Sequence, residues 1–128
     1  MIKKPEELIK KWLDAVNAGD VNTVLGFYDE KAVLIPTFSN RILGKPAQIK
    51  EYFDRLAGRE GLSVALHDKT LVSQPSGEDI YALSGIYCWR FMLDAEMLSF
   101  EARFTYLLDI SQERPILHHH SSEIPRML

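Results

Sequence analysis

The chain has 128 residues, the length of one domain whose hydrophobic core needs no disulfide or metal to stabilise it. Hydrophobic residues make up 46% and charged residues 26%, the balance of an ordinary soluble globular protein. The formal net charge of −3 at pH 7 offers no basic surface for nucleic acid or an anionic membrane. We therefore expect a single domain over residues 1–128 that binds neither nucleic acid nor membrane.

Two further features indicate the compartment. Cys88 is the only cysteine, so the chain can form no internal disulfide. The N-terminal residues MIKKPEE are not followed by the apolar run of a secretory signal, and no apolar stretch is long enough to span a membrane. We expect a reducing, cytoplasmic location.

The first half of the chain predicts three amphipathic helices. Pro5 opens the first, because proline suits the first helical position, and Gly19 ends it. Asp20 caps the second helix, Pro46 starts the third, and Gly58 and Gly61 close it. Each helix has an apolar stripe at helical spacing: Leu8, Ile9, Trp12, Leu13 and Val16 in the first, Val21, Val24, Leu25 and Tyr28 in the second, and Ile49, Tyr52, Phe53 and Leu56 in the third.

A short strand over residues 32–35 separates the second and third helices, and the second half of the chain is predicted to be strands. These strands cover residues 62–73, 80–92, 97–110 and 116–122, with short turns between them. Consecutive strands joined by tight turns pair antiparallel, and helices packed on one face of such a sheet define an α+β fold. The long strands are apolar on both faces and no helix remains for the second face, so we expect another copy of the chain to cover it.

The last two predicted strands carry polar residues where a sheet core usually has Val and Ile. Side chains alternate between the two faces of a strand, so residues two apart share a face. This alternation defines four same-face pairs: Arg103 with Thr105, Phe104 with Tyr106, His118 with His120, and His119 with Ser121. The pattern indicates either a lined cavity or a polar interface.

The order of elements and several segments resemble the nuclear transport factor 2-like superfamily. The segments are KWLDAVNAGDVNTVLGFYDEKAVLIPTFS, IKEYF, SGIYCWRF, EARFTY and ILHHHSSEIP. Within the superfamily, the chain is most similar to the SnoaL-like bacterial proteins and to the association domain of calcium/calmodulin-dependent protein kinase II. The resemblance implies a cone-shaped α+β fold of N-terminal helices packed on a curved, mostly antiparallel sheet. It does not select a function, because the superfamily contains enzymes, binding proteins and assembly domains.

Similarity to the association domain implies a pocket between the sheet and the helices, in which arginines receive small carboxylates. Arg103 lies where one of these arginines would lie, whereas Ser121 occupies the position of another, so a full arginine cluster is not carried over. A kinase-tethering role is not expected, since no kinase domain precedes the chain.

Arg103 has two interpretations. It is either exposed, alone or paired with Glu101 or Glu123, or it is a cation that lines the cavity and receives a carboxylate. In the second case we expect Arg103 to point inward with Thr105, beside the face that carries His119 and Ser121. A register slip of one residue would place His118 and His120 beside Arg103 instead.

The three consecutive histidines have three interpretations. They form structural hydrogen bonds, they contribute one or two pocket residues, or His118 and His120 bind zinc. A zinc site lacks further ligands at recognisable spacing, so we expect no metal and no cofactor. The aromatic residues are expected in the core, with a subset lining the pocket: Trp12, Tyr28, Tyr52 and Tyr87.

The expected function is to bind a small molecule, a carboxylate or another polar organic ligand, as a homodimer formed through the sheet face. The dimer is expected because Trp89, Phe91, Phe104 and Tyr106 exceed what three helices can cover. Two alternatives stay open: an acid/base enzyme of isomerase, cyclase or hydrolase type, and an assembly hub without a ligand. No Asp has the spacing that would mark it as a base, and Asp20 is better explained as a helix cap.

Overall fold

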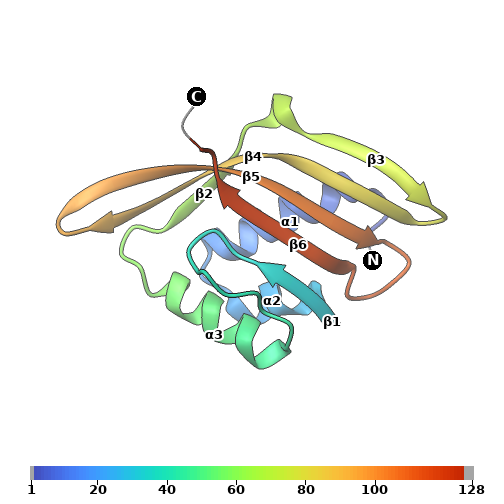
Figure 1. The fold of residues 1–128 in the computed structure, drawn as a ribbon, viewed down its shortest axis with the longest axis horizontal. Coiled ribbons are helices and arrows are strands. Elements are labelled where there is room, and N and C mark those ends of the chain that lie inside the picture. The colour runs from blue at the N-terminus through green and yellow to red at the C-terminus, as the bar shows by residue number, and fades with distance from the viewer. Residues whose placement is uncertain (1, 126–128) are drawn as a thin grey trace.

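Three helices lie on one side of a curved six-stranded sheet (Figure 1). The structure is a computed structural model and describes residues 2–125. Its elements in chain order are α1 (Pro5–Asn17), α2 (Val21–Gly26), β1 (Tyr28–Ile35), α3 (Pro46–Ala57), β2 (Ser63–Leu66), the 3-10 helix η1 (Asp68–Thr70), β3 (Val72–Gly77), β4 (Ile80–Leu93), β5 (Glu96–Asp109) and β6 (Ile116–Glu123). The α+β class, with helices packed on a mostly antiparallel sheet, is confirmed.

The sheet is antiparallel except at one edge. The strand order is β1-β6-β5-β4-β2, and β3 also pairs with β4. At the edge β1 runs parallel to β6, with Val33 opposite His118 and Ile35 opposite His120. The long β4–β5 hairpin turns at Asp94 and Ala95, whose φ angles of 50° and 65° are those that a two-residue hairpin turn requires. These two long strands form the floor on which the helices pack.

The apolar alternation of β5 decides which face of the sheet is inside. Ala102, Phe104, Tyr106 and Leu108 are each 2% exposed or less, whereas Arg103 between them is exposed. A register shifted by one residue would bury the charges and expose the aromatic rings, so the apolar set fixes the register.

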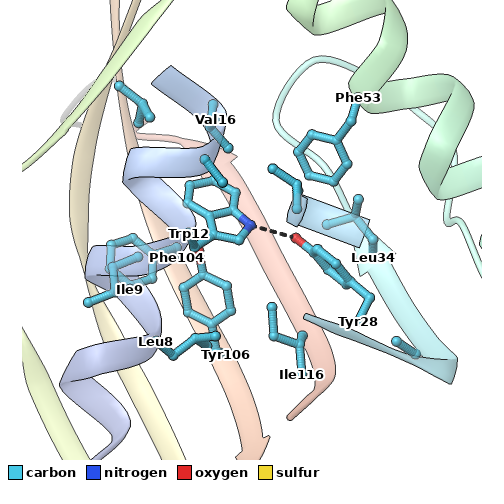
Figure 2. Close-up of a cluster of buried hydrophobic side chains, with 14 of the residues drawn as sticks. Leu8, Ile9, Trp12, Val16, Tyr28, Leu34, Phe53, Phe104, Tyr106 and Ile116 are labelled. Atoms are coloured by element: carbon cyan, nitrogen blue, oxygen red, sulfur yellow. Dashed lines mark hydrogen bonds between the residues drawn. The ribbon is translucent and has the colours of Figure 1, made fainter. Parts of the chain in front are cut away.

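Helix α1 covers the inner face with its predicted stripe. Leu8, Ile9 and Trp12 are completely buried, and Figure 2 shows them against the aromatic side chains of the sheet. The Trp12 ring stacks on Tyr87 with centroids 5.8 Å apart and meets Tyr106 edge-on at 5.9 Å. Each such large apolar side chain contributes about 1.5–3 kcal/mol through burial, so this contact is a main source of stability.

The helix predictions are confirmed except for one residue. The Asp20 side chain accepts the Thr23 N–H and so caps α2 as expected. Tyr28, however, is the first residue of β1, because α2 already ends at Gly26 and Tyr28 pairs with Ile116 of β6. The parallel pairing of β1 with β6 was not predicted.

The predicted strand over residues 62–73 is wrong, because the structure divides it into β2, η1 and β3. The Thr70 hydroxyl donates to the His67 carbonyl and accepts the Ile86 N–H, which replaces a strand-to-strand hydrogen bond at this point. The turn predicted between residues 73 and 80 is also shorter than expected, since β3 continues to Gly77 and the chain reverses at residues 78–79.

The sheet face away from the helices, here called the outer face, is not covered by any element of residues 2–125. The aromatic residues expected there are instead buried on the helix side, each 5% exposed or less: Trp89, Phe91, Phe104 and Tyr106. The dimer was expected because these four aromatic side chains would lie on the outer face, and that placement is wrong. The outer face instead mixes polar side chains such as Thr105 with apolar ones such as Leu107.

Gly85 of β4 provides space for the Phe104 ring on the neighbouring strand. A Cβ atom at residue 85 would lie 2.9 Å from Cζ of Phe104, which is 2% exposed and has no room to move. We expect Gly85→Ala to lower the free energy of unfolding by about 1–3 kcal/mol, measured by urea denaturation. Gly44→Ala is the matched control, because nothing lies within 4 Å of its added methyl group. Equal losses in the two variants would contradict this account.

Candidate functional site

A small cavity lies between the sheet and the helices and is here called the inner cavity. Its volume of about 10 Å³ is the space of about one water molecule. It is lined by Trp12, Leu34, Pro36, Thr37, Tyr52, Phe53, Tyr87, Trp89, His119 and Ser121. Aromatic and apolar walls with a few polar groups are typical of small-molecule sites.

A chain of buried hydrogen bonds begins at α1 and reaches His119 on β6. Trp12 Nε1–H donates to the Tyr28 hydroxyl oxygen over 3.1 Å, the hydrogen bond drawn in Figure 2. The Tyr28 hydroxyl lies 2.8 Å from His119 Nδ1. An indole nitrogen only donates, so the Tyr28 oxygen accepts from Trp12 and its proton is free to go to Nδ1.

The chain continues from the other ring nitrogen of His119. Tyr87 donates its hydroxyl proton to Ser121 Oγ over 2.6 Å, and its oxygen lies 3.2 Å from His119 Nε2. The Ser121 hydroxyl in turn bonds the Thr37 hydroxyl, which follows the end of β1. Because Tyr87 has already used its proton, Nε2 carries the histidine proton and donates to Tyr87. The donors therefore follow one direction, from Trp12 to Ser121.

His119 is held neutral in this arrangement. It is 2% exposed, and its ring stacks on Tyr106 with centroids 4.0 Å apart. Burial lowers the pKa of His119 to about 3, and the neighbouring His118 and His120 add to the shift. An imidazolium would also lose the hydrogen bond at Nδ1, which accepts only in the neutral ring.

The tyrosines around His119 are neutral as well. Burial raises the pKa of Tyr28 and of Tyr87 far above the usual value for a phenol. Burial also raises the pKa of Tyr52, whose hydroxyl accepts the Phe38 N–H at 3.4 Å. The site therefore offers hydrogen-bond donors and acceptors but no charge near neutral pH.

Two buried polar atoms have no hydrogen-bond partner among residues 2–125. They are Nε1 of Trp89, which lines the inner cavity, and the hydroxyl of Tyr106. The Tyr87 hydroxyl is near Trp89 Nε1 but lacks hydrogen-bond geometry. Buried donors are normally satisfied, so a water or a ligand acceptor in the cavity would give Trp89 its missing partner.

Tyr52 and Phe38 meet at the edge of the inner cavity, where Tyr52 lines the cavity and its hydroxyl accepts the Phe38 N–H. Tyr52 lines this cavity and also a larger hollow on the outside, where Phe38 lies. The Phe38 ring packs edge-on against Trp89, Phe91 and Phe100 with centroids 5.3–5.8 Å apart. A cavity of about 10 Å³ has no room for a ligand larger than water, so such a ligand must displace lining side chains.

The structure brings together six of the predicted ligand-binding residues and separates the other four. Trp12, Tyr28, Tyr52, Tyr87, His119 and Ser121 lie on the helix side. Arg103, Thr105, His118 and His120 belong to the outer face, through the pairings of Arg103 with Ser122, Thr105 with His120 and Leu107 with His118.

The inward orientation of Arg103 is therefore wrong. Its strand neighbours Phe104 and Tyr106 occupy the inner face, and burying a guanidinium without a partner costs several kcal/mol. Arg103 is exposed and alone, the unpaired form of the first interpretation: Glu101 bonds His67 at 2.7 Å, and Arg103 forms no ion pair within residues 2–125. The alternative register, with His118 and His120 on the arginine side, is the observed one.

Sequence reasoning did not single out Thr37 or Trp89 as site residues. Thr37 follows a strand and a proline, a position at which a short hydroxyl side chain can turn back toward the sheet, and this was the available signal. Trp89 was counted among the aromatic residues of the dimer face, without a polar role. Within residues 2–125, no three His, Cys, Asp or Glu side chains are grouped as for a metal ion. No helix of that part is long and apolar enough to cross a membrane.

Comparison with known proteins assigns the sequence to one family. The model of the calcium/calmodulin dependent protein kinase II association domain family matches residues 5–125. No curated protein sequence matches the chain closely enough to count as a relative.

Solved structures share the fold at low sequence identity. A candidate association domain of this kind from Xanthomonas campestris has a TM-score of 0.84 and 22% identity, over 95% of this chain and 86% of that one. A ketosteroid isomerase-like protein from Erwinia carotovora atroseptica has a TM-score of 0.78 and 13% identity, over 94% of each chain. The association domain of the C. elegans kinase has a TM-score of 0.72 and 16% identity, over 91% of each chain.

The buried neutral His119 makes stability depend on pH in one direction. The unfolded chain binds the histidine proton near pH 6.5 and the folded chain only near pH 3, so stability falls as the pH drops between these values. We expect a loss of about 2 kcal/mol from this group between pH 6.5 and 5, measured by urea denaturation. His119→Asn should flatten this slope, whereas His120→Asn, the same change on the outer face, should retain it. A slope that His119→Asn leaves unchanged would contradict the assignment.

Proposed function

Because the chain belongs to the calcium/calmodulin dependent protein kinase II association domain family, we propose that it is a homo-oligomerising domain that binds a small polar organic molecule in the inner cavity. The observation that carries the ligand proposal is the directed hydrogen-bond chain from Trp12 to Ser121. Such a network inside an apolar core is costly unless every group is satisfied, and packing alone does not require it. The hydrogen-bond chain ends at Thr37, which lines the inner cavity, and the unsatisfied Trp89 Nε1 belongs to a second lining residue.

The ligand proposed for the inner cavity is uncharged. No Lys, Arg, Asp or Glu is among the residues that line the cavity, and His119 is neutral. A buried carboxylate would find no cation there to offset its desolvation. A hydroxyl or carbonyl group, by contrast, could take the hydrogen bonds offered by Thr37 and Trp89.

Binding is favoured over acid/base catalysis because the inner cavity lacks a group suited to act as a general base. A general base works best with a pKa near the operating pH, and burial moves the pKa of His119 to about 3. No carboxylate lines the inner cavity to replace it. Ligand recovered unchanged after incubation with the protein supports binding, and conversion of the ligand would favour the enzyme alternative.

Oligomerisation is proposed to use the outer face. Two rows of side chains cross it, each built from facing residues of β1, β6, β5 and β4. The rows are Val33, His118, Leu107 and Ala82, and Ile35, His120, Thr105 and Ser84. Apolar contacts mixed with hydrogen-bonding groups suit an interface between copies, and Leu107, 37% exposed, lies in the middle of the first row.

The outer-face proposal predicts that a charge at residue 107 dissociates the oligomer. Leu107→Glu would bury an unpaired carboxylate between the copies, so light scattering at micromolar concentration should give a mass near the 14.7 kDa of one chain. Ile42→Glu is the control, since Ile42 is 68% exposed in the loop after β1 and belongs to neither row of the outer face, and it should keep the larger mass. A single-chain mass for the unaltered protein would refute oligomerisation.

The inner-cavity proposal predicts a specific role for the Thr37 hydroxyl. Small neutral probes, phenol and cyclohexanone, should shift the amide NMR signals of residues around Thr37 and His119. Thr37→Val keeps the side-chain shape and removes one hydrogen bond, so the affinity should fall about three- to tenfold. Thr105→Val is the same change on the outer face and should leave the affinity unaltered. Absence of binding by both probes and by larger neutral homologues would refute the proposal.

A further inference from the structure

A second hollow, here called the mouth pocket, lies outside Phe38 and Tyr52, between the loop after β1 and helix α3. Its volume of about 540 Å³ is within the range of small-molecule sites, about 300–1,000 Å³. It is lined by Phe38, Ser39, Arg41, Leu43, Gln48, Glu51, Tyr52, Asp54, Arg55, Leu56, Gly58 and Arg59. Unlike the inner cavity, it needs no side-chain movement to admit a molecule of this size.

The acidic side chains of the mouth pocket are paired with basic ones, whereas two of its arginines are not paired. Its two acidic residues are already paired on α3, Glu51 with Arg55 at 2.8 Å and Asp54 with Lys50 at 2.7 Å. Arg41, from the loop, and Arg59, just after α3, form no ion pair within residues 2–125. The pocket thus has two uncompensated guanidinium groups on a chain whose net charge is −3. A local positive potential on an otherwise acidic protein favours anions.

The walls of the mouth pocket are suited to a flat apolar group. Phe38 and Tyr52 contribute aromatic surface, and both are only partly buried. Leu43 and Leu56 also line the pocket and are 4% and 5% exposed. The Arg59 guanidinium carbon lies 5.4 Å from the centroid of the Phe91 ring, which holds this cation close to aromatic surface.

We propose that the mouth pocket binds a small organic anion with a flat apolar body, whose charged head group is held by Arg41 and Arg59 and whose body lies against Phe38 and Tyr52. A guanidinium suits such a head group because its planar fork donates two parallel hydrogen bonds to an oxyanion. This site is separate from the inner cavity and does not require that cavity to open.

The test uses naphthalene-2-sulfonate and its neutral counterpart naphthalene-2-sulfonamide, titrated at low salt and followed by amide NMR signals. The sulfonate should bind more tightly and shift residues 38–59, and added salt should weaken it. Arg41→Gln and Arg59→Gln should each lower its affinity about two- to fivefold, the scale of an exposed ion pair. Arg103→Gln, the same change on the outer face, is the matched control and should have no effect.

Glu51→Gln should raise the sulfonate affinity, whereas the two arginine variants should lower it. It releases Arg55 from its ion pair and removes a negative charge from the pocket, so sulfonate affinity should rise about two- to fivefold. A variant that merely disturbed the fold would not tighten binding.

Four results would overturn the inference. They are equal affinities for sulfonate and sulfonamide, an effect of Arg103→Gln equal to that of Arg41→Gln, no gain with Glu51→Gln, and inorganic phosphate binding as tightly as the sulfonate, which would exclude a role for the apolar walls. None of them bears on the inner cavity or the oligomer, since phenol binding and light scattering test those separately.

Discussion

The buried neutral imidazole of His119 is the interaction on which the interior of this protein depends. Both ring nitrogens are hydrogen-bonded, Nδ1 to Tyr28 and Nε2 to Tyr87, and through them the ring connects α1, β1, β4 and β6. Such a group is stabilising only while every partner is present, because an unsatisfied polar atom in the core costs about 1–3 kcal/mol. Polar contacts therefore hold the helices on the sheet together with apolar packing.

The inner cavity and the mouth pocket therefore offer a ligand different interactions. A neutral histidine between neutral tyrosines gives the inner cavity directional hydrogen bonds but no charge. The mouth pocket, which shares Tyr52 with the inner cavity, has uncompensated arginines and solvent access. Charge is thus kept at the surface, where its desolvation cost is small, and hydrogen bonding is kept inside.

Much of the fold could be predicted from the sequence, because capping residues and apolar spacing act locally. Pro5, Asp20 and Pro46 marked helix starts that the structure confirms. The parallel pairing of β1 with β6 could not be predicted, since nothing local encodes a contact between residues about 85 positions apart. The family resemblance implies an inward Arg103, whereas the apolar alternation of Ala102, Phe104 and Tyr106 indicates that these three residues face the core. Arg103 lies between these residues on the strand, so its side chain points to the opposite, outer face.

The most direct test of this account is the tautomer of His119, read from a long-range ¹⁵N–¹H correlation spectrum of the imidazole rings. The hydrogen-bond directions set by Trp12 and Tyr87 predict a ring protonated on Nε2 and unprotonated on Nδ1, unchanged between pH 7 and pH 5. A ring protonated on Nδ1, or an imidazolium at pH 5 in the folded protein, would contradict the account.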